Sequence, residues 1–322
     1  MPFKRNTGSF PAVIPDITPQ SRGPAMLYRI RETLNRSRLD RALRPILTTK
    51  PIRADGANIL VFSAVSHRDL LMYLAAVKSL LRFLPPSGVV AMNDGSLTAN
   101  DQAVLHTHLP GLRIVLGKDI ETGKVPADIM WQRMFWSIKL AERAYVIQLD
   151  SDTLTLARPD AVLETISAGK SFILGTGECL AIDTVAARAA AVANRPSNNI
   201  QTVSERAMPG LPDAGTRRYV RGSAGFYGFG RGHVGFEDAE TLFTEMNRLT
   251  NNRFIEYGSE QFAANFLVAN TRDAVVLPFP TYAVHHISYE LTGAIFLHFI
   301  GSYRFHRGTY VKAAQNVISE LQ

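Results

Sequence analysis

Strand-like and helix-like stretches alternate along the chain from residue 57 onward. Residues 58–66 (NILVFSAVS) are rich in Ile, Leu, Val and Phe, as is typical of a buried strand. In residues 67–84 leucine or valine recurs at spacings of three or four, which predicts a helix that Pro85 ends. The alternation predicts an α/β fold with a mixed, mostly parallel sheet flanked by helices. It continues with expected strands at 88–98, 112–116, 145–149 and 171–177 and with expected helices at 101–108 and 127–144.

The second half of the chain is less regular. Residues 194–221 are rich in Pro, Gly, Asn and Arg and predict a long loop or flap. Residues 218–232 alternate aromatic and small side chains, and their glycines would let a ligand or another backbone approach closely. Helices are expected at 237–249, 259–269 and 311–321, and strands at 274–280 and 293–301.

Composition limits the class of protein. The chain has 322 residues, of which 46% are hydrophobic, enough for a sizeable core. Its single cysteine, Cys179, excludes both an intramolecular disulfide framework and a cysteine-based zinc site. No apolar run approaches the length of a membrane span, and residues 1–20 lack the apolar core of a signal peptide. These features predict a cytoplasmic protein.

The net charge of +7 is concentrated at the N-terminus. Residues 1–55 hold eleven Lys and Arg against four Asp and Glu, whereas the rest of the chain is neutral. We expect an irregular, proline-containing arm over residues 1–23 and then an amphipathic basic helix from Pro24. This helix either packs on its own domain or lets residues 24–53 contact an anionic membrane surface peripherally. No nucleic-acid-binding pattern accompanies the charge, so no nucleic-acid partner is expected.

The apolar face of this helix would be formed by Met26 or Leu27, Ile30, Leu34, Leu39, Leu43 and Leu47. We therefore predict two parts, a basic arm at residues 1–55 and one α/β domain at residues 56–322.

Two carboxylates follow the expected strand at 145–149. Asp150 and Asp152 flank Ser151, and on a strand that continued through them both side chains would share a face and could bind one cation. Open α/β sheets bind ligands at the carboxyl ends of their strands. A turn with two solvated acids is an equally good interpretation of these residues alone.

Further motifs lie at characteristic distances from this Asp-x-Asp triplet. Arg133 lies one helix upstream, and the sequences Ser223-Ala224-Gly225, Glu260-Gln261 and His298-x-x-Gly301-x-x-Arg304 follow downstream. Over residues 57–310 this pattern resembles nucleotide-sugar-dependent glycosyltransferases of the GT-A fold. It is most similar to the retaining enzymes of glycosyltransferase family eight, which include glycogenin and bacterial galactosyltransferases.

The resemblance implies a metal site and a phosphate site. Asp150, Asp152 and His298 would hold Mn²⁺ or Mg²⁺, which neutralises the nucleoside diphosphate leaving group. Arg304 stands where the family has a phosphate-binding lysine, and its planar fork also suits phosphate. Arg133 would contact the phosphates or the donor sugar. The implied donor is a UDP-sugar, and the implied enzyme is a hexosyltransferase acting on an unknown glycan, protein or lipid acceptor.

The resemblance also assigns less specific roles. It implies that transfer proceeds with retention and that Glu260 or Gln261 faces the anomeric carbon, and we assign neither a covalent role. Ser223 and Glu260 would contact the donor sugar or hold the acceptor. The remaining expected donor-binding residues are Ser63, Ala64 and Val65 at a uridine-binding edge, Asn93 and Asp94 at the uracil or ribose, and Ser151, Ala224 and Gly301 within the motifs.

Three alternatives remain open. A phosphatase of the haloacid dehalogenase type also uses Asp-x-Asp after a strand, although Leu154 stands where its motif has Thr or Val. A nucleotidyltransferase would need a Gly-rich loop after the first strand, and residues 62–69 contain no glycine. The third alternative is an inactive glycosyltransferase-like scaffold that binds a partner.

Overall fold

The structure is a computed structural model that describes residues 35–286 and 293–322. Within these residues the main sheet has seven strands in the order β10-β6-β9-β4-β1-β2-β3. β9 runs antiparallel to both of its neighbours, and all other pairs are parallel. The predicted mixed, mostly parallel sheet is therefore confirmed. In that order the strands span Val275–Val276, Phe172–Gly175, Gly222–Phe229, Tyr145–Leu149, Ile59–Val65, Gly88–Asn93 and Arg113–Leu116.

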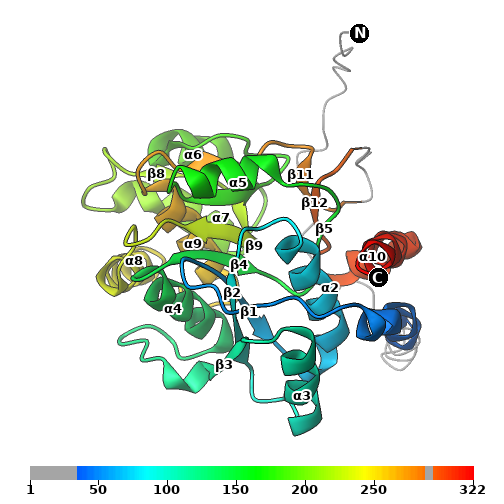
Figure 1. Cartoon of the computed structure of the whole chain (residues 1–322). Helices are drawn as coiled ribbons and strands as arrows, with labels where there is room; N and C mark the ends of the chain where they lie inside the picture. Colours follow the sequence, from blue (N-terminus) through cyan, green and yellow to red (C-terminus); the bar gives the residue numbers. More distant parts are fainter. Residues whose placement is uncertain (1–34, 287–292) are drawn as a thin grey trace, which may run out of the picture.

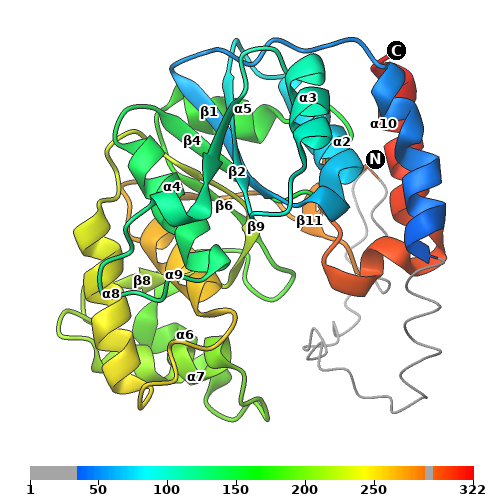
Figure 2. The same cartoon turned by 90° about the horizontal axis from the view of Figure 1, so that it is seen from below.

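Helices cover both faces of this sheet (Figures 1 and 2). Val61 and Ile147 belong to the core on the face of α2 (Leu70–Leu81) and α10 (Thr309–Glu320). Their neighbours Phe62 and Val146 belong to the core on the opposite face. The period-two alternation of each strand thus fills two separate hydrophobic layers. The other helices of the first layer are α3 (Ala99–His108) and α5 (Asp160–Ser167); those of the second are α4 (Ile129–Ala141), α6 (Val185–Val192), α7 (Ile200–Ala207), α8 (Phe236–Leu249) and α9 (Ser259–Ala269).

The predicted loop at residues 194–221 is wrong in part, because it contains α7 and the short strand β8 (Arg218–Tyr219), which pairs with β7 (Asp183–Thr184). α7 begins after Asn199, whose side chain accepts a hydrogen bond from the backbone N–H of Thr202 at 2.9 Å. An eight-residue helix offers few turns in which an apolar period can be recognised. Its existence depends on tertiary packing, in which Ile200 is buried against the second layer.

Of the two geometries open for Asp150 and Asp152, the structure has the turn and not the continuing strand, although Asp152 is buried and not solvated. β4 ends at Leu149, the chain turns at residues 150–152, and β5 (Thr153–Thr155) starts a second sheet of order β11-β12-β5. β12 (Phe296–His298) is shorter than the predicted strand at 293–301, and a 3₁₀ segment (Gly301–Gly308) begins at the last residue of the predicted range. β11 (Tyr282–Val284) completes this sheet. The acids therefore meet through a turn, and not as alternate residues of one strand.

The described part of the N-terminal segment packs on the domain. Residues 35–43 are helical, and the 3₁₀ segment Arg44–Thr48 follows. This helix lies beside α10 (Figure 2), and Leu39, Leu43 and Ile46 are buried in the first core layer. The expected apolar position Leu47 is wrong: it is 38% exposed, because the change to 3₁₀ geometry turns Ile46 inward instead.

The expected arm at residues 1–23 and the expected apolar positions Met26, Leu27, Ile30 and Leu34 lie outside the described residues. Among the residues that are described, no helix is both long and apolar enough to cross a bilayer.

Candidate metal and phosphate site

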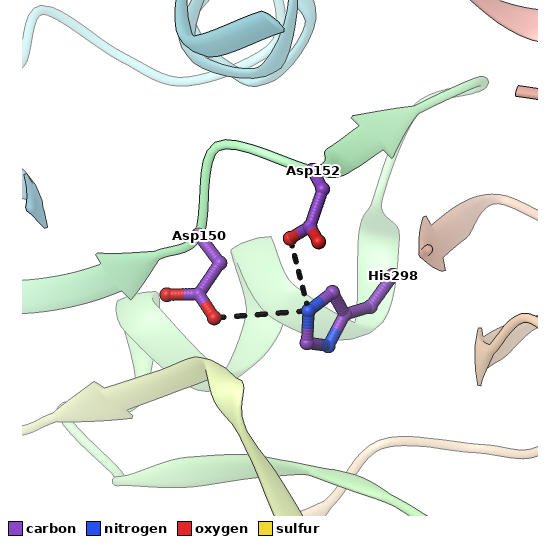
Figure 3. A group of neighbouring side chains, drawn as sticks. All are labelled: Asp150, Asp152 and His298. Atoms are coloured by element: carbon purple, nitrogen blue, oxygen red, sulfur yellow. Dashed lines mark hydrogen bonds and ion pairs between the residues drawn. The ribbon is translucent and has the colours of Figure 1, made fainter. Parts of the chain in front are cut away.

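Two carboxylates and one imidazole converge where β4 ends (Figure 3). His298 Nε2 lies 3.1 Å from Asp152 Oδ1 and 3.7 Å from Asp150 Oδ2. The strand pairing explains this meeting: β12 runs antiparallel to β5 with His298 opposite Thr153, and the Phe299 N–H donates to the Asp152 carbonyl at 2.9 Å. The turn at residues 150–152 and the β5–β12 ladder therefore place three residues that are distant in the sequence around one point.

The fit of these residues to a divalent cation follows from their chemistry. One ligand atom from each of Asp150, Asp152 and His298 lies within 4.8 Å of the other two. Two carboxylate oxygens and one imidazole nitrogen suit Mn²⁺ well, and Mg²⁺ accepts the two oxygens. Both Asp152 and His298 are buried, and buried carboxylates are costly unless they are paired or coordinate a metal. The three side chains therefore fit a divalent metal.

The ring of His298 is held by β9. Its Nδ1 lies 2.9 Å from Ser223 Oγ, so the Nε2 atom is the one turned toward the carboxylates. Gly225 lies directly beneath the ring, and a Cβ atom there would stand 2.1 Å from His298 Cε1. The backbone carbonyl of Gly225 also accepts the Asp150 N–H at 2.8 Å. A side chain at Gly225 would therefore displace the imidazole.

Two arginines flank the cluster. Arg133 Nη1 lies 2.5 Å from Asp150 Oδ1, which also accepts a hydrogen bond from Gln148 Nε2 at 2.8 Å. On the other side, Arg304 Nη2 lies 3.0 Å from Asp152 Oδ2. The formal charges of the two acids and the two arginines cancel, so a bound divalent cation would leave the site positive. A positive site of this kind suits a diphosphate.

Neighbouring charges offset the effect of burial on the pKa values of Asp152 and Arg133. Burial alone would raise the pKa of the Asp152 carboxyl, but His298 and Arg304 together hold that pKa below its ordinary value. Burial likewise opposes the charge on Arg133, yet the nearby Asp150 keeps the pKa of this guanidinium raised. Both side chains therefore keep their charges at neutral pH.

The expected catalytic pair lies at the first turn of α9. Glu260 is buried, and its Oε2 accepts the Gly258 N–H at 3.1 Å. Burial raises the pKa of Glu260, and Arg133 offsets part of this rise, so the carboxyl is electrostatically connected to the metal cluster. Gln261 follows it and is partly exposed.

The expected nucleoside residues lie at the ends of β1 and β2. Ser63 and Val65 are buried within β1, and Ala64 between them is partly exposed. Asn93 Oδ1 accepts the N–H groups of Gly95 and Leu97, at 2.8 and 3.2 Å. Asp94 is exposed, and its Oδ1 accepts both the N–H and the hydroxyl of Ser96, at 2.9 and 2.6 Å. The side chains of Asn93 and Asp94 therefore stabilise their own turn, whereas the buried Ser63 Oγ has no hydrogen-bond partner among the described residues.

The remaining expected residues lie within the motifs. Ser151 is partly exposed in the turn between the two acids, and Ala224 is buried in β9. Gly301 has a φ of +55°, a conformation that favours glycine, and its carbonyl accepts Arg304 Nε–H at 2.8 Å. The carbonyl of Gly301 thus orients the guanidinium of Arg304.

Sequence reasoning missed several residues of this site. The sequence patterns predict a strand at Gln148 and a small-residue motif at Gly225, but a site role for neither of them, and they assign nothing to Asp69. Asp69 Oδ1 lies 3.9 Å from Arg304 Nη1. The polar Gln148 within an otherwise apolar strand was the one local signal available.

Comparison with known proteins finds no matching family model and no matching curated protein. Several solved glycosyltransferases resemble the chain. The galactosyltransferase LgtC, in complex with donor and acceptor sugar analogues, has 14% identity and a TM-score of 0.46 and covers 81% of this chain and 94% of its own. The bifunctional glycosyltransferase WbbM has 11% identity and a TM-score of 0.44 and covers 83% of this chain and 52% of its own.

Core-mannan synthase A from Aspergillus fumigatus, in a Mn/GDP form, has 11% identity and a TM-score of 0.39 and covers 75% of this chain and 78% of its own. These TM-scores all lie below 0.5, so the function proposed below rests on the sequence motifs and on the geometry of the site.

Proposed function

We propose that the protein is a metal-dependent GT-A glycosyltransferase that moves a sugar from a UDP-linked donor to an acceptor with retention of configuration. The observation that carries the proposal is the convergence of Asp150, Asp152 and His298 between two arginines at the carboxyl end of a strand. A site with these charges suits a substrate that carries a diphosphate and a divalent cation. The Asp-x-Asp and H-x-x-G-x-x-R motifs supply the same residues.

The residues have distinct roles in this proposal. Asp150, Asp152 and His298 hold Mn²⁺ or Mg²⁺, which stabilises the charge that develops on the departing diphosphate. Ser223 orients the imidazole through Nδ1, as hydrogen-bond partners commonly do for metal-bound histidine. Arg304 and Arg133 bind the phosphate oxygens by charge-assisted hydrogen bonds.

The sugar end of the donor would lie near the N-terminus of α9. Glu260 and Gln261 then face the donor sugar, and the burial of Glu260 keeps bulk water away from its carboxyl. Asn93, Asp94 and Ala64 would lie along the nucleoside, because β1 and β2 follow β4 in the sheet and neighbouring strands are about 5 Å apart. The distance across one or two neighbouring strands matches the distance between the diphosphate and the base of the same nucleotide.

A donor screen tests the proposal. Purified protein with Mn²⁺ is incubated with a panel of UDP- and GDP-sugars, first alone and then with glycan, protein and lipid acceptors, and the released nucleoside diphosphate is measured. Release of UDP is expected, with a mass increase of one hexose on an acceptor. Asp152→Asn should abolish the release, whereas Asp160→Asn, which changes an exposed acid on α5, should not. Release of inorganic phosphate or pyrophosphate without any nucleoside diphosphate would contradict the proposal.

A further inference from the structure

The N-terminal helix contributes one buried charge to the domain. Arg36 is 9% exposed, whereas Arg38 and Arg41 on the same helix are exposed. Its Nη2 donates to the backbone carbonyl of Arg68 and, at 2.6 Å, to Asp69 Oδ1. A buried guanidinium needs such partners, because desolvation without them is costly. This contact joins the basic N-terminal segment to the loop that follows β1.

Asp69 is held in a fixed orientation at this loop. It lies directly before α2, and its Oδ2 accepts the hydroxyl of Ser66 at 2.9 Å. Its backbone N–H donates to the same hydroxyl at 3.2 Å. The other oxygen, Oδ1, faces both Arg36, at 2.6 Å, and Arg304 Nη1, at 3.9 Å. One carboxylate oxygen is thus shared between a structural arginine and the arginine of the proposed phosphate site.

Arg304 in turn lies between two carboxylates. Its Nη2 contacts Asp152 Oδ2 at 3.0 Å, and its Nη1 approaches Asp69. A carboxylate that coordinates a divalent cation has less charge to offer a guanidinium, and the cation repels that guanidinium. Asp69 is the acid that can still attract Arg304 under these conditions.

We propose that Asp69 is a positioning residue that holds Arg304 in the diphosphate site, and that Arg36 orients Asp69. The N-terminal helix would then be part of the donor-binding apparatus through a chain of contacts from Arg36 to Asp69 to Arg304. The inference rests on the proposed function, because it takes Arg304 as the phosphate-binding cation. It assigns the buried arginine of the basic segment a role in donor affinity, in addition to its packing.

Binding of UDP with Mn²⁺, measured by calorimetry, is the first test. Asp69→Asn keeps the size of the side chain and its bond to Ser66 but removes its charge, so UDP affinity should fall about ten-fold. Arg36→Gln should lower it roughly three-fold, and Arg36→Lys should restore part of the loss. Arg38→Gln, an exposed arginine on the same helix, is the matched control and should have no effect.

Binding of Mn²⁺ alone separates this role from general damage. If Asp69 positions Arg304, its variant should change Mn²⁺ affinity less than two-fold while UDP affinity falls. An equal loss in both would mean that Asp69 merely supports the fold of the metal site and would overturn the inference. Unchanged UDP affinity in Asp69→Asn would do the same.

A double-mutant cycle tests the contact without any ligand. Asp69→Asn and Arg304→Gln, alone and together, are compared by urea unfolding, and their effects on the unfolding constant should deviate from additivity about three-fold. Additive effects would refute the contact. If the wild-type protein bound no UDP with Mn²⁺, the proposed function would fail, and this cycle would still decide whether Asp69 holds Arg304.

Discussion

Two neighbouring regions on one edge of the sheet use their polar residues in different ways. In the first region, which we call the metal edge (residues 148–153, 223–225 and 298–304), side chains from separate elements point to a common centre. In the second, the β1–β2 end (residues 63–66 and 93–97), Asn93 and Asp94 bond to N–H groups of their own turn. Asn93 and Asp94 thus bond within one turn, whereas the charged groups of the metal edge pair across elements and converge on one point.

The buried charges of the metal edge also have different partners from the buried Lys78 of α2. At the metal edge Arg133 has Asp150, and Asp152 has both His298 and Arg304. In the last turn of α2, by contrast, the buried Lys78 contacts Thr49 Oγ1 at 2.5 Å, the Lys50 carbonyl at 2.6 Å and His108 Nδ1 at 3.4 Å, and none of these partners is a carboxylate. Mutual pairing keeps the first set charged, whereas burial lowers the pKa of Lys78 to about 8.

The largest effect is expected from Asp152→Asn at the metal edge. The substitution keeps the side-chain size but removes a proposed metal ligand and the partner of both His298 and Arg304. The rate of metal-dependent transfer should fall at least about a thousand-fold, because charge stabilisation by the metal contributes several kcal/mol. Steady-state kinetics with a UDP-sugar, beside calorimetry of Mn²⁺, measures this. If Asp152→Asn bound Mn²⁺ as tightly as the wild-type protein, Asp152 would not be a metal ligand.

Gly225→Ala should come next, with a loss of Mn²⁺ affinity of about a hundred-fold. The added methyl would collide with the His298 ring, which must then leave the cluster. Gly215→Ala is the matched control, since a Cβ there meets nothing within 4 Å. Calorimetry on both variants is decisive, and equal affinities would show that the ring does not need its present position.

Ser223→Ala tests the bond that orients the histidine. Loss of the partner at Nδ1 should weaken Mn²⁺ binding 10- to 100-fold, which is usual for an outer partner of a metal-bound histidine. Ser223→Thr keeps a hydroxyl and should recover part of the affinity. If Ser223→Ala bound Mn²⁺ as tightly as the wild-type protein, Ser223 would not have this role.

Asp94→Ala probes the β1–β2 end. If Asp94 contacts the nucleoside, UDP with Mn²⁺ should bind roughly ten-fold more weakly, while Mn²⁺ alone binds as before. Ser96→Ala serves as the control, because it removes the two bonds of the Ser96 hydroxyl, one to Asp94 and one from the His67 N–H, and leaves the carboxylate. If Asp94→Ala bound UDP with normal affinity, Asp94 would not contact the nucleoside. The proposal that the metal edge binds the diphosphate and the β1–β2 end binds the nucleoside would then be wrong.

The smallest effect concerns stability and pH. The folded-state pKa of Lys78, about 8, lies below its unfolded value of about 10.4, so between these values the unfolded chain binds the proton and the folded chain does not. The free energy of unfolding of the wild-type protein should therefore rise from pH 8 to pH 10, and Lys78→Met should lack this rise. Urea unfolding of both proteins across this range gives the difference, and parallel pH profiles would contradict the lowered pKa.

The class of sheet and the place of the metal edge along the chain follow from local sequence patterns. Alternating apolar periods are local, so the strands at 59–65, 88–93 and 145–149 and the helix at 259–269 follow from residues close in sequence. Asp150, Asp152 and His298 were found because their motifs are local too. The short helix α7 is not predicted, since it has no period long enough to recognise, and the residues 150–152 alone do not decide between a turn and a continuing strand.

Which side chains meet depends on the packing of elements that are distant in the sequence. Ser223 and His298 are 75 residues apart, and Asp152 and His298 are 146 apart, so their contacts depend on strand order and register. The same holds for Asp69, which precedes Arg304 by 235 residues in the sequence and yet lies 3.9 Å from its Nη1 atom. Local sequence patterns determine periodicity and turn chemistry, whereas the packing of distant elements determines the distances between side chains. The proposed binding of a metal ion and a diphosphate depends on those distances.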